Sequence, residues 1–477
     1  MKISFHGADR DVTGSCHLVE CAGLRVLIDC GLVQGDREME ERNRAPFGFD
    51  PKSIDFVLLT HAHLDHCGRL PLLTKRGFRG EIIATSATRD LARIVMLDSA
   101  HLQEEEERHA RFRREHGRHE DRHGAHPDGS RGETPSDETA LYTTLDALDS
   151  IDRFGRAASY GEAISLAPGV RATFFDAGHI VGSASVFLEL EENGTRRTVT
   201  FSGDLGNQGR PLLRPPVAPP HSDIVVMETT YGDRLHKPLA PSIEELYAAI
   251  HEAFEHGGNV VIPTFALERA QEILWFLREG QEKGRISEMA QVFLDSPMAI
   301  SATQIFERHP ECFEPNVAQL FRSGGGDPFA LPGLHFTRDA TESIAINRFR
   351  SGAIILAGAG MCNGGRVRHH LRQNLWRSNC AVVFVGYAAR GTLARRIIDG
   401  AQTVRIFSED VPVRARLHTI NGFSAHADRD ELLSWHRAIR PPRTILVHGE
   451  PEVMQSFAGL LDGTRVEMPE FGQEIEI

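Results

Sequence analysis

The chain has 477 residues, of which 41% are hydrophobic and 25% are charged, and this composition is typical of a globular enzyme with two or three domains. No apolar run is long enough to span a bilayer, so no membrane-spanning helix is expected. The net charge of −13 argues against nonspecific nucleic-acid binding by the whole surface, but it leaves room for a local basic groove.

The cysteines and the N-terminal residues bear on cellular location. The seven cysteines are scattered and include no Cys-x-x-Cys pair, which does not favour structural disulfides. The first residues have the pattern of a strand and lack the shape of a signal peptide. We therefore predict a cytoplasmic protein that does not enter a membrane.

The chain up to residue 209 has the pattern of short strands that end at Gly or Asp. The predicted strands are Leu24–Ile28, Ile54–Leu59, Ile82–Thr85, Arg171–Phe175, Ser185–Leu190 and Thr198–Ser202. Residues 104–138 break this pattern because they are rich in Glu, Arg and His and poor in apolar side chains. We predict an exposed charged helix in the first half of this insertion and a disordered segment over 117–137.

A Pro-rich stretch, Pro211–Pro220, predicts a domain boundary. Beyond it, strands alternate with helices, which is the pattern of a parallel α/β sheet. The predicted pairs are Val260–Pro263 with a helix from Leu267, Gln291–Leu294 with Ser301–Arg308, Ile354–Ala357 with Arg366–Leu375, and Ala381–Val385 with Thr392–Ile398. From about Val404 the strand-rich character returns. We therefore predict that a domain formed by 1–209 and 404–477 is interrupted by an inserted domain over 210–403.

The stretch His61-Ala62-His63-Leu64-Asp65-His66 carries four potential metal ligands in six positions. The apolar run before it predicts a buried strand and Gly68–Leu73 predicts a following helix, so the cluster is expected on a strand-to-helix loop. His61 and His63 project to one side at strand-like spacing. Asp65 and His66 can turn to a second point a few ångströms away. This density of ligands predicts a site for two metal ions.

Four further motifs place a polar side chain at the end of an apolar strand. These side chains are Asp29, His179, Asp204 and His448. Imidazole nitrogens suit zinc, and a carboxylate can bridge two ions with its two oxygens. Two metal ions about 3.5–4 Å apart can activate a water and clamp both oxygens of an in-line phosphoryl displacement. The set predicts a two-metal hydrolase.

These motifs together resemble the metallo-β-lactamase superfamily. The inserted α/β domain, with Glu228, His426 and His448 in their contexts, resembles the β-CASP branch of RNA-processing nucleases. That branch includes the endonuclease subunit of eukaryotic pre-mRNA 3′-end cleavage and its bacterial and archaeal relatives. The resemblance covers the chain apart from the His-rich insertion. It implies an αββα metallo-β-lactamase sandwich with an inserted parallel-sheet α/β β-CASP domain.

The resemblance also implies a role for each matching residue. One zinc ion would be bound by His61, His63 and His179. The other zinc ion would be bound by Asp65, His66 and His448. Asp65 would also be a catalytic residue. Asp204 would bridge both ions, and Asp29 would orient the histidine cluster through hydrogen bonds.

Glu228 and His426 form a candidate proton-donating pair. The ribose oxygen that leaves a phosphodiester needs a proton, and a carboxylate stabilises the charged form of a neighbouring imidazole. We therefore predict that His426 is the general acid and that Glu228 orients it. The alternative is a structural histidine held by hydrogen bonds.

The Gly-rich segment Gly358–Gly365 follows one predicted strand and precedes a helix. Backbone N–H groups at such a place bind anions, and the spacing misses the dinucleotide-binding fingerprint. The resemblance implies a pocket for the RNA backbone, and the alternative is a tight turn that needs glycine for packing. The expected RNA-binding residues are Gly360, Asn363, Gly364, Gly365, Arg366, Arg390 and Ser424.

The leading hypothesis is a zinc-dependent ribonuclease that hydrolyses single-stranded RNA by a two-metal mechanism, as an endonuclease, a 5′-exonuclease or both. A second hypothesis is a hydrolase of the same fold that acts on DNA or on a small ester or thioester. His448 favours RNA, because DNA-repair members of the branch usually lack a histidine there. A third hypothesis is an inactive RNA-binding subunit, which the complete ligand set disfavours. Homo-oligomerisation is left open.

Overall fold

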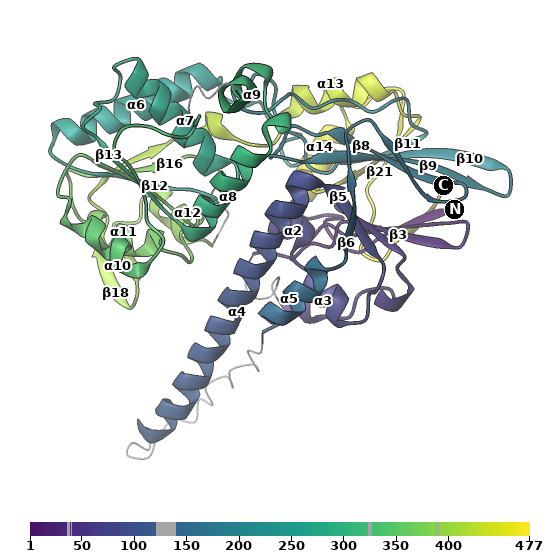
Figure 1. Ribbon diagram of the computed structural model, residues 1–477, viewed down its shortest axis with the longest axis horizontal. Coiled ribbons are helices and arrows are strands. Elements are labelled where there is room, and N and C mark those ends of the chain that lie inside the picture. Colours follow the sequence, from purple (N-terminus) through teal and green to yellow (C-terminus); the bar gives the residue numbers. More distant parts are fainter. Residues whose placement is uncertain (36–38, 40, 121–139, 323–326, 387, 389–390) are drawn as a thin grey trace.

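The computed structural model describes residues 1–35, 39, 41–120, 140–322, 327–386, 388 and 391–477. Within these ranges the chain forms two seven-stranded sheets, a six-stranded sheet and a two-stranded hairpin (Figure 1). None of the helices described is both long enough and apolar enough to cross a membrane. The seven cysteines are buried and unpaired, which confirms the prediction of no structural disulfides.

The first two sheets contain the N- and C-terminal parts of the chain. The first sheet runs in the order β22 (Glu474–Glu476), β1 (Lys2–Phe5), β2 (His17–Cys21), β3 (Leu24–Ile28), β4 (Phe56–Leu58), β5 (Glu81–Thr85), β6 (Phe154–Ala158). The second runs in the order β21 (Arg465–Glu467), β20 (Arg443–Val447), β11 (Ile224–Glu228), β10 (Thr195–Phe201), β9 (Ala184–Glu192), β8 (Val170–Asp176), β7 (Ala163–Ala167). The six strands predicted before residue 209 all lie in these sheets; Leu24–Ile28 has the predicted bounds, and the bounds of the other five are shifted by one to three residues.

The two sheets pack face to face because their side chains alternate between two faces. Ile3, Val26, Phe174 and Val226 belong to one buried cluster between the sheets. The opposite face of the second sheet is covered by α13 (Arg429–Ile439) and α14 (Pro451–Ala458). The opposite face of the first sheet is covered by α2 (Leu64–Cys67), α3 (Leu70–Lys75), α4 (Ser86–Glu120) and α5 (Thr144–Ile151). The layers are helix, sheet, sheet, helix, which confirms the predicted αββα sandwich.

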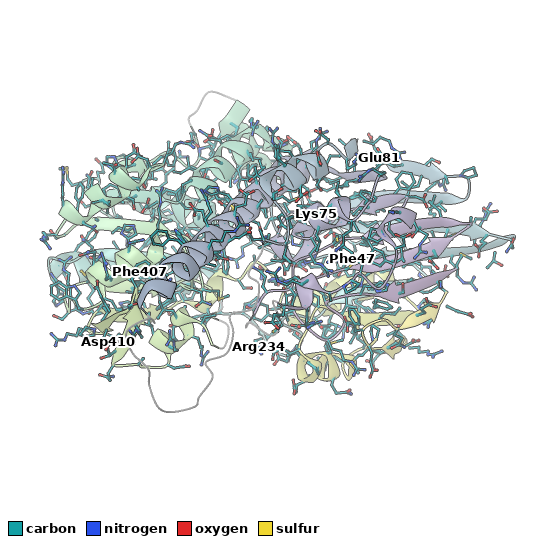
Figure 2. All side chains as sticks on the ribbon, turned by 90° about the horizontal axis from the view of Figure 1, so that it is seen from below. Phe47, Lys75, Glu81, Arg234, Phe407 and Asp410 are labelled. Carbon is teal, nitrogen blue, oxygen red and sulfur yellow. The ribbon has the colours of Figure 1, made fainter. Side chains whose placement is uncertain are left out.

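The third sheet is the predicted parallel α/β sheet. Its order is β14 (Leu334–Phe336), β13 (Gln291–Asp295), β15 (Ala353–Ala357), β12 (Val260–Pro263), β16 (Ala381–Phe384), β19 (Arg416–Thr419), and every pairing is parallel. The hairpin is β17 (Thr403–Ile406) with β18 (Glu409–Pro412). Figure 2 shows Phe407 and Asp410 of this hairpin in the left half of the view, and Phe47 and Glu81 of the sandwich in the right half.

Helices cover both faces of the third sheet, because successive strand residues point to opposite sides. Val260 and Ile262 face one buried cluster and Val261 faces another. The helices on the first side are α6 (Leu239–Glu255), α7 (Arg269–Glu282), α8 (Pro297–Arg308) and α9 (Pro315–Arg322). On the second side lie α11 (Val367–Asn374) and α12 (Leu393–Ile398), and α10 (Ala340–Ala345) precedes the short helix η4 (Ile346–Arg348).

Helix α4 confirms the predicted charged helix but is longer than expected. Its first half is buried against the sandwich, and its second half extends away from the body of the molecule (Figure 1). The helix continues to Glu120 and so overlaps the start of the segment predicted to be disordered. Arg and Glu favour helix and pair four residues apart, as Glu107 and Arg111 do at 2.5 Å. The rest of that segment, from residue 121, lies outside the described residues.

Strand pairing bears on the predicted domain boundaries at 209/210 and 403/404. Strand β11 pairs with β10 and β20 in the second sheet, although it follows the Pro-rich stretch. Strand β19 pairs with β16 in the third sheet, although it follows Val404. We propose that the inserted domain begins between Glu228 and Leu239 and ends after Thr419. The Pro-rich stretch connects β10 to β11, outside the strand ladders to which Pro cannot donate, and Leu213 in it pairs with Phe313.

Candidate metal centre

The predicted metal ligands, with Asp29 and Glu228, converge at one edge of the sandwich. Strands β3, β4 and β5 are mutually parallel, as are β10, β11 and β20. The carboxyl ends of each set therefore meet at the same edge, which is where ligand sites form on parallel strands. The side chains at or just after these ends are Asp29, His61, His63, Asp204, Glu228 and His448. His179 joins them from the end of β8, the strand beyond β9.

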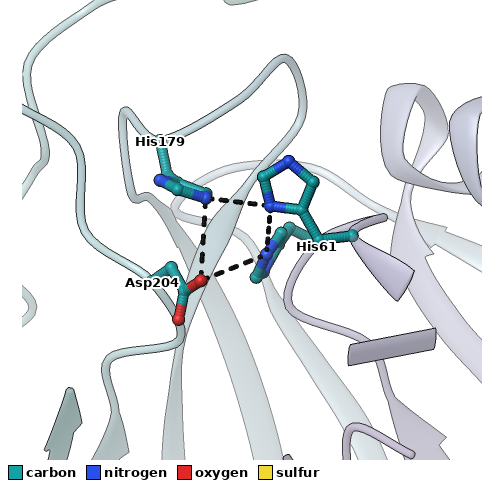
Figure 3. Close-up of side chains that lie close together, drawn as sticks. His61, His179 and Asp204 are labelled. Carbon is teal, nitrogen blue, oxygen red and sulfur yellow. Dashed lines mark hydrogen bonds and ion pairs between the residues drawn. The ribbon is translucent and has the colours of Figure 1, made fainter. Parts of the chain in front are cut away.

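Four side chains form a first group whose ligand atoms all lie within 4.8 Å of one another: His61, His63, His179 and Asp204. Nδ1 of His63 lies 3.1 Å from Nε2 of His61 and 3.1 Å from Nε2 of His179. Oδ2 of Asp204 lies 3.5 Å from Nε2 of His61 and 3.6 Å from Nε2 of His179. Figure 3 shows His61, His179 and Asp204 pointing toward one another.

A second group consists of Asp65, His66 and His448. Nε2 of His448 lies 3.5 Å from Oδ2 of Asp65. The other oxygen of Asp204, Oδ1, lies 3.3 Å from Nε2 of His66 and 3.7 Å from Nδ1 of His448. Each oxygen of Asp204 therefore faces a different group. The expectation of a loop is wrong for Asp65 and His66, because α2 already begins at Leu64 and carries both.

The ionisation of these side chains suits a cation. Burial lowers the pKa of His61 and His179 well below its usual value, and that of His63 to about 4, so all three imidazoles are neutral at pH 7. Neutral imidazole is the form that binds metal. Burial opposes a charge on His66, but Asp204 and Asp29 raise its pKa well above the usual value. The three neutral imidazoles of the first group thus present lone pairs to its centre, whereas a metal ion at His66 would have to displace the proton that Asp204 and Asp29 favour.

The residues present fit a metal better than a set of hydrogen bonds. The imidazole nitrogens of the first group that face one another at 3.1 Å belong to neutral rings, and a neutral ring carries only one N–H. A cation placed among these nitrogens would be bound by their lone pairs. Oδ1 of Asp204 and Nε2 of His448 are buried, and neither makes a hydrogen bond of good geometry among the described residues, although they lie 3.3 Å from Nε2 of His66 and 3.5 Å from Oδ2 of Asp65. A buried polar atom without a partner is costly. Three imidazoles with a carboxylate, beside a second group of two imidazoles and a carboxylate, form a donor set typical of zinc.

Asp29 lies directly behind the second group. Its Oδ2 accepts hydrogen bonds from Nδ1 of His66 at 2.7 Å and from the Thr60 hydroxyl at 2.7 Å, and its Oδ1 accepts from the Thr60 N–H at 2.8 Å. The contact leaves Nε2 of His66 facing Asp204. An orienting role for Asp29 requires such contacts, and the role itself stays a prediction. Thr60 was not singled out in the sequence, although it directly precedes His61.

Glu228 and His426 lie next to the first group. Nδ1 of His426 lies 3.3 Å from both carboxylate oxygens of Glu228 and 4.0 Å from Oδ2 of Asp204. Burial alone would lower the pKa of His426, but the Glu228 carboxylate outweighs it and raises that pKa to about 9. Ligand atoms of Asp204, Glu228 and His426 also lie within 4.8 Å of one another, so a ligand role for His426 is a second interpretation.

The residues expected to bind RNA have partners within the chain. The Arg366 guanidinium donates to Asp295 at 2.7 Å and to the backbone oxygens of Thr337 and Arg338. The Asn363 side chain accepts from the Leu393 N–H at 2.9 Å. These contacts favour structural roles for Arg366 and Asn363, and their contact with RNA stays a prediction.

The glycines and Ser424 can be placed in the same way. The Ser424 hydroxyl accepts from the His426 N–H at 3.2 Å, within its own loop. A Cβ at Gly360 would lie 2.9 Å from the Phe265 ring, and Gly365 has φ +74°, with its Cβ position 2.3 Å from the Gly358 oxygen, so packing accounts for both. Around Gly364 there is open space. Arg390 lies outside the described residues.

Comparison with known proteins agrees with this geometry. Residues 9–250 match the Metallo-beta-lactamase superfamily, residues 270–397 match the Beta-Casp domain, and residues 410–469 match the Zn-dependent metallo-hydrolase RNA specificity domain. Ribonuclease TTHA0252 from Thermus thermophilus is 40% identical over 479 residues, which cover 100% of both chains. Transcription termination factor FttA from Methanocaldococcus jannaschii is 30% identical, over 96% of this chain and 68% of the relative.

A solved structure supports the fold. A protein of unknown function from Enterococcus faecalis V583 has a TM-score of 0.52 and 12% identity over 99% of both chains. The three matched regions follow one another in the order that an inserted domain requires. The chain therefore belongs to the β-CASP branch of the metallo-β-lactamase superfamily.

Proposed function

We propose that the protein is a zinc-dependent ribonuclease that hydrolyses phosphodiester bonds of single-stranded RNA with two bound zinc ions. The observation that carries the proposal is Asp204, whose two oxygens face two separate ligand groups. The name of the relative that is 40% identical over the whole chain supports RNA as the substrate. The description of the domain matched by residues 410–469 supports both zinc and RNA.

In this proposal His61, His63 and His179 would hold one ion, and Asp65, His66 and His448 would hold the other. Asp204, whose two oxygens face the two groups, would contribute to both. Bound zinc supplies Lewis acidity, which activates a water and stabilises charge on the phosphate oxygens. The chain's own acid is His426. Its Nδ1 faces Glu228, so Nε2 is the atom that donates a proton to the leaving oxygen.

The test compares wild type with Asp65→Ala on 5′-labelled single-stranded RNA, after the zinc content of each protein is measured by mass spectrometry. We expect about two zinc ions per wild-type chain, from the two ligand groups, and cleavage products from wild type alone. Internal fragments would indicate an endonuclease, and labelled mononucleotides a 5′-exonuclease. Intact RNA in both lanes from zinc-loaded protein would reject the ribonuclease. Equal cleavage by both proteins would reject the metal assignment.

A further inference from the structure

A buried ion pair joins the inserted domain to Arg210, a residue that also bonds the loop carrying His426. Glu272 lies in the first turn of α7, and its Oε1 accepts from Nη1 of Arg210 at 3.0 Å. Arg210 lies in the connection after β10, six residues beyond Asp204. The two side chains are 4% and 10% exposed, so solvent screens the pair little. Arg269 donates to the other oxygen of Glu272.

The second arm of Arg210 holds the loop Gly422–His426. Its Nη2 donates to the backbone oxygens of Ser424 and, at 3.1 Å, Gly422. A guanidinium is a rigid planar fork, so its two arms fix both partners relative to each other. The ion pair with Glu272 therefore fixes the orientation of the Arg210 guanidinium, and with it the position of the loop oxygens to which Nη2 donates.

The same loop contacts two site residues. His426 extends from its end toward Glu228, and the Ala425 oxygen accepts from Nδ1 of His179 at 3.2 Å. The His426 oxygen is held in turn by the Asn207 side chain at 2.7 Å and lies 2.9 Å from Nε2 of His236. A shift of the loop would displace the imidazole of His426 relative to its carboxylate partner.

Neither stability nor RNA binding accounts well for the pair. A buried ion pair adds little net stability, because desolvation offsets the attraction between the charges. A phosphate contact is disfavoured because Arg210 is almost fully buried and already has acceptors on both arms. The remaining role is geometric.

We propose that Arg210, braced by Glu272, is a positioning residue that holds the loop Gly422–His426 so that His426 meets the scissile phosphate. The inference rests on the acid role proposed for His426. It also explains how the inserted domain, through α7, contributes to catalysis without contacting the reacting atoms.

The test is a double-mutant cycle of Arg210→Met with His426→Ala, with kcat and KM measured on single-stranded RNA. In the wild-type background we expect Arg210→Met to lower kcat by about 10- to 100-fold, because a small misplacement of a catalytic group has this effect. In the His426→Ala background the same change should lower kcat by less than about threefold, because residues that act as a unit are non-additive. An equal loss in both backgrounds would overturn the proposal.

Two further variants and a control guard against misfolding. Glu272→Gln keeps the shape of the side chain and should reproduce part of the loss, and Arg210→Lys should restore activity only in part, because an ammonium cannot reach both partners. Arg278→Met removes an ion pair with Glu282 from the same helix and should leave kcat unchanged. Zinc content and thermal unfolding are measured for each protein.

Hydrogen–deuterium exchange provides a readout that does not depend on activity. Residues 421–427 should exchange faster in Arg210→Met than in wild type, and residues 443–448 should not change. If exchange of 421–427 is unchanged, the positioning role is rejected. If His426→Ala has wild-type kcat, the acid role proposed above is rejected instead, and exchange alone decides whether Arg210 holds the loop.

Discussion

Both carboxylate oxygens of Glu228 lie 3.3 Å from Nδ1 of His426. Glu228 is completely buried, whereas 22% of the His426 side chain is exposed. The Leu205 N–H donates to Oε1 of Glu228 at 2.5 Å, which fixes the carboxylate in place. Glu228 therefore holds the His426 imidazole at Nδ1, and the rest of the ring is partly exposed. A proton donor to a bound substrate requires this arrangement.

Replacing Glu228 by Gln should lower kcat and leave zinc content near that of wild type. The amide keeps the shape but removes the negative charge that stabilises the imidazolium, and general acid catalysis contributes about 10²- to 10⁴-fold. Steady-state kinetics with metal analysis on the same preparations checks the prediction. His426→Ala is the companion variant. Loss of zinc in that variant would make His426 a ligand and contradict the acid role.

Asp204→Ala should abolish RNA cleavage and remove zinc from both groups, because one carboxylate faces both. We expect fewer than one of the two proposed zinc ions per chain to remain after gel filtration. Asp223→Asn is the matched control, since Asp223 lies before β11, at the opposite end of the strand from Glu228, and accepts from Thr198. Retention of one tightly bound zinc ion with normal cleavage would contradict the bridging role.

Asp29→Asn should weaken zinc binding by about 10- to 100-fold, the usual effect of losing a partner that orients a metal-binding histidine. Asp29 bonds Nδ1 of His66 at 2.7 Å and thereby directs Nε2 to the site. Competition with a chelator of known affinity measures the effect. Asp55→Asn is the control. The Asp55 side chain is exposed, and its one hydrogen bond among the described residues is accepted from the backbone N–H of Arg25. Equal zinc affinity in wild type and Asp29→Asn would remove the orienting role.

Asp295→Asn should destabilise the protein at neutral pH and less so in acid. Burial alone would raise the pKa of Asp295, but hydrogen bonds from His370, Ser343, Thr337 and Arg366 outweigh it and lower that pKa. Removing one partner of such a buried pair costs about 3–5 kcal/mol. Because the folded pKa lies below the unfolded value of about 3.9, this stabilisation is complete above that pH and is lost as the pH falls below it.

Urea unfolding of wild type and Asp295→Asn at pH 7, 5 and 3.5 checks this pH dependence. The difference in unfolding free energy should be constant between pH 7 and pH 5 and smaller at pH 3.5. A difference that grows on acidification would show that Asp295 is protonated in the folded protein. The same variant also tests whether Arg366 has a structural role, because its guanidinium would lose an ionic partner.

Much of the fold follows from local pattern. Strand β3 at Leu24–Ile28 and strand β12 at Val260–Pro263 have the predicted bounds, because buried parallel strands are short apolar runs closed by turns. The polar residue at the end of each run identified the ligand candidates for the same reason. Hydrophobic periodicity is a property of a few consecutive residues, so it can be recognised without knowledge of distant contacts.

Tertiary structure decided what each of these residues faces. Arg366 lies 71 residues from Asp295 and Arg210 lies 214 residues from Ser424, and such pairings arise only when strands from separate segments align. The sequence by itself determined the residue types of the candidate metal site and the strands that carry them. Packing of the two sheets and the inserted domain decided which oxygen of Asp204 meets which histidines, because side-chain direction depends on neighbours that are distant in the chain.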